Sequence, residues 1–265
     1  MIKRRNFLTC LFLLPLLGFM SCDEFFSTSW GSERDYDSSK ITLDADNLDS
    51  WIEKSIGNPE LASALTQKII EEVQKLPDGG TRVKFQEAGV SLAVEASGVG
   101  TSIVSNAAKA IGEIDEKGEK GEQAVKDILK DIQGDFNKNG PKAAKDLAAI
   151  VGPSIGGGGT VPEFTGAYAS AAKPSDVTQA VLILSLAVLG KEGGDISNTI
   201  DGLTEGEVIG GLTLDNSGNR ITATDPSPEA KALAAYLNLI ATDTTGKFKK
   251  DTVTGKLREL FELDD

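Results

Sequence analysis

The sequence predicts a mainly α-helical protein, an irregular helical bundle with one small β-hairpin near residues 212–223. The first observation is that apolar side chains recur every three or four residues over several segments, which is typical of helices with one buried face. The second is that pairs typical of helix starts, such as Asn58-Pro59 and Pro174-Ser175, precede these segments. The third is the stretch LTLDNSGNRITA, in which two alternating segments flank a turn.

The first two helices are predicted from about residue 46 and from Pro59, and the second ends at the Pro-Asp-Gly-Gly stop of residues 77–80. Their apolar faces consist of Leu48, Trp51, Ile52 and Ile56 in the first, and Leu61, Leu65, Ile69, Val73 and Leu76 in the second.

Small apolar residues fill the next segment, 81–114. Their spacing predicts a helix, in which Gly98 and Gly100 indicate a kink or a close helix contact. Because Val83 and Phe85 alternate with polar residues, a strand at the start of this segment stays open as an alternative.

In the second half, a charged loop at 115–121 precedes two predicted helices, at 122–133 and 141–151. The glycine-rich segment 152–166 is predicted to be irregular and is the best internal boundary. A division of the domain into two lobes that meet at this hinge stays an alternative to a single compact domain. Further helices are expected in the segments listed here: the most apolar one from Pro174 to Gly190, another after Pro226 to Pro228 carrying Leu233, Tyr236, Leu237 and Ile240, and a short one carrying Leu257, Leu260 and Phe261.

The first 21 residues have the composition of a signal peptide. Three basic residues near the start and no acidic residue precede the apolar run Phe7–Met20. Fourteen helical residues rise only about 21 Å, less than the roughly 30 Å of a membrane's hydrocarbon core. An ordinary export cut after Ser21 would need a small residue at Phe19 as well. This mismatch suggests cleavage of another kind. The alternatives are a membrane helix and an ordinary export signal with an incidental cysteine.

The stretch Leu17-Gly18-Phe19-Met20-Ser21-Cys22 resembles the lipobox of bacterial lipoproteins. The resemblance implies cleavage before Cys22, a diacylglycerol on its sulfur and a fatty acyl group such as palmitate on its new amino group. Phe19 and Met20 depart from the usual residues and are similar to the looser boxes of spirochaete lipoproteins. The resemblance covers about 22 residues and therefore concerns localisation and membrane attachment alone. It implies a lipid anchor in the bacterial cell envelope, without specifying the membrane or the leaflet.

This interpretation divides the chain into a signal peptide at 1–21, a flexible Ser-rich tether at 22–40 and a helical domain at 41–265. Removal of residues 1–21 takes three of the 27 basic residues and none of the 40 acidic ones, so the formal charge falls from −13 to −16. That charge opposes binding to nucleic acid or to anionic lipid headgroups.

The chain has no histidine, and its two cysteines are Cys10 in the signal peptide and Cys22. A Ser-His-Asp or Cys-His nucleophile pair is therefore excluded, and so are imidazole metal ligands and a disulfide in the mature chain. Hydrolysis by paired carboxylates or by lysine passes this filter. With 40 acidic residues, chance neighbours are common, so we nominate no catalytic residue and no cofactor.

Two motifs suggest ligand binding. Asp135, Asn137, Asn139 and Gly140 match the opening of an EF-hand calcium loop, with Asp146 at the twelfth position. Lys142 and Pro141 depart from that pattern, and a helix–loop–helix connection without calcium is favoured, so we assign no metal. The glycine run Gly156–Gly159 completes neither a P-loop nor a dinucleotide motif and is interpreted as a hinge.

Two classes of function remain open. One is a lipid-tethered, non-catalytic binding or assembly module of the envelope, which holds a protein partner or an apolar ligand. The apolar segments at 88–111 and 177–189 are favoured as two central core helices, and a cavity for such a ligand, if the fold has one, would be lined by them. The other is a histidine-independent envelope hydrolase, for example one that acts on glycan. We favour the module, because no nucleophile–base pair can be built from His or Cys and an aromatic content of 6% is low for a sugar-stacking cleft.

Overall fold

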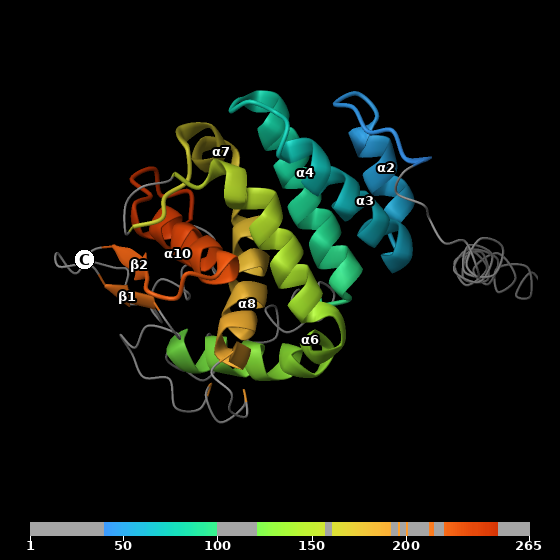
Figure 1. Ribbon diagram of the computed structural model, residues 1–265. Helices are drawn as coiled ribbons and strands as arrows, with labels where there is room; N and C mark the ends of the chain where they lie inside the picture. Colours follow the sequence, from blue (N-terminus) through green and yellow to red (C-terminus); the bar gives the residue numbers. More distant parts are fainter. Residues whose placement is uncertain are drawn as a thin grey trace, which may run out of the picture. The chain divides into compact units, whose positions relative to one another are not determined.

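A computed structural model describes residues 40–99, 121–156, 161–191, 196, 200, 212–214 and 220–248, all within the compact unit Asp37–Asp265. These residues form seven α-helices, one 3-10 turn and one two-stranded antiparallel sheet (Figure 1). The prediction of a mainly helical fold with a small β-hairpin is therefore confirmed.

Polar side chains order the chain before each of the first two helices, although a side-chain cap is formed at α3 alone of the two. Before α2 (Leu48–Ser55), the Asp44 carboxylate accepts a hydrogen bond from the backbone N–H of Asn47 at 2.8 Å. Before α3 (Pro59–Val73), the Asn58 side chain accepts one from Leu61 N–H at 3.0 Å, as its sequence predicts. The predicted faces are only partly buried: Leu48 and the α3 residues Leu61, Leu65, Ile69 and Val73 are buried, whereas Ile56 is 72% exposed.

Helix α4 (Gly80–Ser97) covers the segment in which a strand is the alternative prediction, so Val83 and Phe85 are helical, and both are buried. Gly98 does not kink this helix but ends it, with a left-handed φ of +70° that favours glycine. The close contact lies instead at Gly89, where a Cβ atom would be 2.8 Å from Ile69 Cγ2 of α3 and 3.0 Å from Ile150 Cδ1. Glycine at position 89 therefore lets three helices approach one another.

Helix α6 (Gly121–Val151) corrects the prediction of two helices joined by a loop, because it runs continuously through that segment. Pro141 lies inside it and removes one helical hydrogen bond, which costs about 3 kcal/mol in a helix interior. Burial of Phe136 before the proline and of Leu147 after it offsets that cost, and Gly140 leaves room for the Phe136 ring. Figure 1 shows α6 changing direction part-way along its length, as expected for a proline in a helix.

Helix α8 (Pro174–Lys191) is the most apolar helix, as predicted, and it is buried on nearly all sides from Val177 to Leu189. It packs against α6 and α10, and also contacts α4. At its C-terminal end, Lys191 forms an ion pair of 2.9 Å with the buried Glu229 in the first turn of α10 (Pro228–Ala241). The α8 core therefore joins helices from both halves of the chain.

The predicted hairpin consists of β1 (Leu212–Leu214) and β2 (Ile221–Ala223), with Thr213 paired to Thr222. Its second strand rests on α10, which begins at the predicted position with Ser227 as its cap. The short helix predicted around Leu257 lies outside the described residues, as do 100–120.

Candidate functional site

The lipidation candidate Cys22 lies outside the described residues, as do the predicted signal peptide at 1–21 and the predicted tether at 22–40 up to residue 39. Among the helices that the structure describes, none combines the length and apolar character that a membrane crossing requires. The anchor therefore stays a prediction from the sequence.

The EF-hand-like residues do not form a loop, because Asp135 to Asp146 are part of helix α6. Asp146, which would be the twelfth-position ligand, accepts a hydrogen bond from Gln67 at 3.0 Å and forms an ion pair with Lys142 at 2.7 Å. Lys142 also donates to Ser63 Oγ at 3.2 Å. In this arrangement Asp146 joins α6 to α3 instead of facing an ion, and the described residues contain no cluster of three or more metal-ligating side chains.

The start and the end of the glycine-rich segment pair with each other. Gly156 N–H donates to Glu163 O at 2.7 Å, and Thr165 N–H donates to Ser154 O at 2.8 Å. An isolated antiparallel bridge joins Ile155 to Phe164 between these two bonds. Residues 157–160, which include most of the glycine run, lie outside the described part of the chain.

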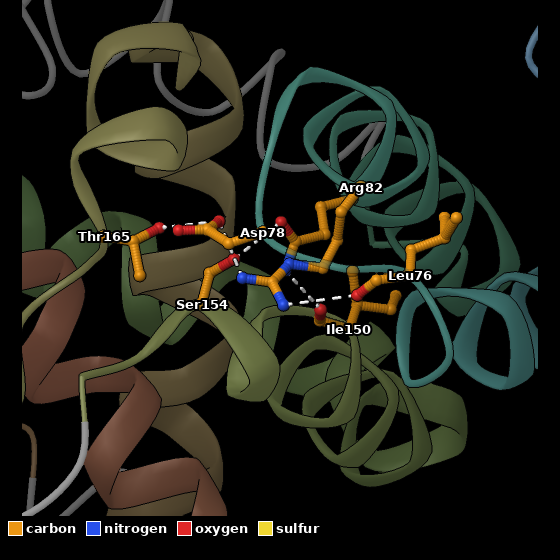
Figure 2. A network of polar contacts seen from close by, with 7 residues as sticks. Leu76, Asp78, Arg82, Ile150, Ser154 and Thr165 are labelled. Carbon is orange, nitrogen blue, oxygen red and sulfur yellow. Dashed lines mark hydrogen bonds and ion pairs between the residues drawn. The ribbon is translucent and has the colours of Figure 1, made fainter.

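A network of polar contacts surrounds Arg82 at the start of α4 (Figure 2). Its guanidinium donates to the Asp78 carboxylate at 2.7 Å and, at a longer 3.4 Å, to Leu76 O. Thr165 Oγ1 lies 3.4 Å from the same carboxylate, so this ion pair also faces the end of the glycine-rich segment. Arg82 Nε is buried and has no hydrogen-bond partner within the described residues.

One turn further along α4, the buried Gln86 continues the polar contacts into the core. Its Nε2 donates to Ile150 O at 2.9 Å, and its Oε1 accepts a hydrogen bond from Ser154 Oγ at 2.9 Å. The first bond satisfies a carbonyl in the last turn of α6, where helical carbonyls lose their own partners, and the second binds Ser154 in the 3-10 turn Gly152–Ser154 that follows. Gln86 therefore fixes the end of α6 against α4.

Two tyrosines, Tyr168 of α7 (Gly166–Ala171) and Tyr236 of α10, are fully buried with their hydroxyl oxygens 2.8 Å apart in a shared hydrogen bond. The ring of Phe164 lies at 4.5 Å and 4.8 Å from their ring centroids. Burial raises the pKa of each hydroxyl well above its usual value, and the nearby Asp176 adds to the increase. Both tyrosines are consequently neutral over the physiological range.

Two carboxylates lie close to this tyrosine pair. Burial raises the pKa of Asp176, in the first turn of α8, against the lowering effects of a hydrogen bond from Ser175 Oγ and the charge of Lys173. Glu87 of α4 lies 3.8 Å from Lys173 Nζ. A carboxyl group with a raised pKa can hold or release a proton nearer neutral pH, which is the property a general acid requires.

Asn238 of α10 holds two separate segments at once. Its side-chain oxygen accepts a hydrogen bond from Ile221 N–H at 2.7 Å. Its amide nitrogen donates to Ile221 O at 2.8 Å and to Pro162 O at 2.9 Å. All three bonds are buried, so Asn238 fixes the β-hairpin and the end of the glycine-rich segment to α10.

Sequence reasoning missed Gln86, Asn238 and the tyrosine pair. Tyr168 is separated from Tyr236 by 68 residues, and Asn238 from Pro162 by 76, so the spacing along the chain gives no sign of either contact. The usable signal was a polar residue on an otherwise apolar helical face, as Gln86 and Asn238 both are. Comparisons of the chain with protein-family models, with curated proteins and with solved structures found no match.

Proposed function

We propose that the protein is a lipid-anchored lipoprotein of the bacterial cell envelope whose helical part is a non-catalytic binding or assembly module. The observation that carries this proposal is the segment Leu17–Cys22, a lipobox-like sequence at the end of a basic and then apolar N-terminal stretch. Acyl chains on Cys22 would hold the chain to a membrane firmly, because each buried CH₂ contributes about 0.8 kcal/mol.

The use of charged side chains in the described helices supports a scaffold over an enzyme. Asp146, Asp78 and Glu229 are each bound to a basic side chain at 2.7–2.9 Å. A carboxylate held in this way stabilises a helix pair or a helix start, and its lone pairs are occupied by donors of the protein itself. Since the whole chain also lacks histidine, the commonest general base is excluded.

The charge of the mature chain limits what the module binds. A formal charge of −16 after removal of residues 1–21 disfavours nucleic acid and favours a partner protein that presents basic residues. An anchored domain meets such a partner at high effective concentration within the envelope, so a weak contact suffices. We therefore infer an envelope protein as the primary partner, with an apolar ligand as the alternative.

The anchor is tested by intact-mass analysis of membrane-extracted protein, with Cys22→Ala against the matched control Cys10→Ala. The parent and the Cys10→Ala protein are expected to lack residues 1–21 and to carry the added mass of two or three acyl chains. Cys22→Ala should lose both the acyl mass and the retention in membranes. If the parent and the Cys22→Ala protein differ only by the mass of the substitution, the proposed anchor is wrong.

The binding role is tested by mild crosslinking in membranes, followed by co-purification. A reproducible envelope partner in the parent sample, lost or reduced with Cys22→Ala, is the expected result. Absence of any partner, together with peptidoglycan turnover by the purified soluble form, would reverse the assignment.

A histidine-independent hydrolase is the second candidate. The observation that favours it is the raised pKa of Asp176, which interacts with the charge of Lys173, and Lys173 Nζ in turn lies 3.8 Å from Glu87. Glycan hydrolysis uses one carboxyl group with a raised pKa as general acid together with a second carboxyl group. Turnover of peptidoglycan that is lost with Asp176→Asn but kept with the exposed control Glu60→Gln would support the hydrolase.

A further inference from the structure

We draw no further inference here: the strongest candidate, the side-chain cluster of Tyr168, Tyr236, Asp176, Glu87 and Lys173 between α4, α7, α8 and α10, rests on raised pKa values and on contacts within the cluster itself, and nothing in the described part of the chain indicates a ligand for it.

Discussion

Asn238 offers the sharpest test of how the described elements are held together. Its amide pairs with both the N–H and the C=O of Ile221, much as a neighbouring strand would, and also binds Pro162 O. The side chain is 1% exposed and Ile221 is fully buried. Replacing Asn238 with Ala therefore leaves three backbone groups without partners.

A buried polar group that loses its partner costs about 1–3 kcal/mol, and water reaching part of the space left by the side chain reduces the sum. We expect Asn238→Ala to lower the free energy of unfolding by about 2–5 kcal/mol. The measurement is urea unfolding of a soluble form that lacks residues 1–22, followed by circular dichroism. The exposed Asn137 of α6 is the matched control, and Asn137→Ala should change stability by less than about 0.5 kcal/mol.

Asn238→Asp tests the same geometry by charge. Aspartate keeps the acceptor for Ile221 N–H but turns an oxygen toward Ile221 O and Pro162 O, so at neutral pH it should destabilise at least as much as alanine. Protonation of that carboxyl restores one donor, so the difference from the parent should narrow as the pH falls. An Asn238→Ala protein within about 0.5 kcal/mol of the parent, or an Asn238→Asp protein whose deficit is independent of pH, would refute this reasoning.

Three further predictions concern other parts of the core. Gly89→Ala should lower the free energy of unfolding by about 1–3 kcal/mol because of the contact with Ile69. Gly134→Ala in α6 adds a Cβ with no atom within 4 Å and should raise the free energy of unfolding by up to about 1 kcal/mol through helix propensity. Equal urea midpoints for the two variants would contradict this prediction. Asp176→Asn should stabilise the protein at pH 7, because a carboxyl whose pKa is raised by folding favours the folded state when protonated and opposes it when ionised. The increase in melting temperature should vanish as the pH falls below the unfolded-state pKa near 3.8, and an increase that persists there would count against the prediction. Burial raises the pKa of Tyr236, so the free energy of unfolding should fall as the pH rises above about 10. Tyr236→Phe should weaken this pH dependence in unfolding curves measured at alkaline pH, and the same dependence in the parent and the variant would contradict the prediction.

Much of the helical architecture could be predicted because it depends on local signals. The caps at Asn58 and Ser227 lie directly before their helices, and the side-chain oxygen of each accepts a hydrogen bond from a backbone N–H of the first turn, as expected. The apolar run of α8 is so dense that only a central position could bury it. The hairpin at 212–223 follows from alternation and turn residues.

The failure at α6 has a physical cause. Asn137, Asn139, Gly140 and Pro141 are all poor helix formers, and their order matched a calcium loop, so local propensity predicted a break. Tertiary packing keeps the helix continuous despite this propensity, because Phe136 occupies the space that Gly140 leaves and apolar residues on both sides of the proline are buried. A single sequence does not reveal that compensation.

The candidate site was harder to predict than the fold. Raised pKa values depend on burial by elements that are distant in sequence. In the sequence alone, nothing distinguishes Asp176 from the other acidic residues; its burial in the folded chain does. A carboxylate pair has no sequence pattern of its own, whereas a lipobox-like segment is recognised from adjacent residues alone.

The paired ends of the glycine-rich segment make it a suitable place for a reporter. Since Gly156 and Glu163 are joined by a 2.7 Å hydrogen bond, a peptide inserted between Gly158 and Gly159 would leave and return at the same point. Doubling the length of a flexible loop costs only about 0.6 kcal/mol. An epitope tag at this position, stained on intact cells and on permeabilised cells, would establish whether the protein faces the medium or the cell interior.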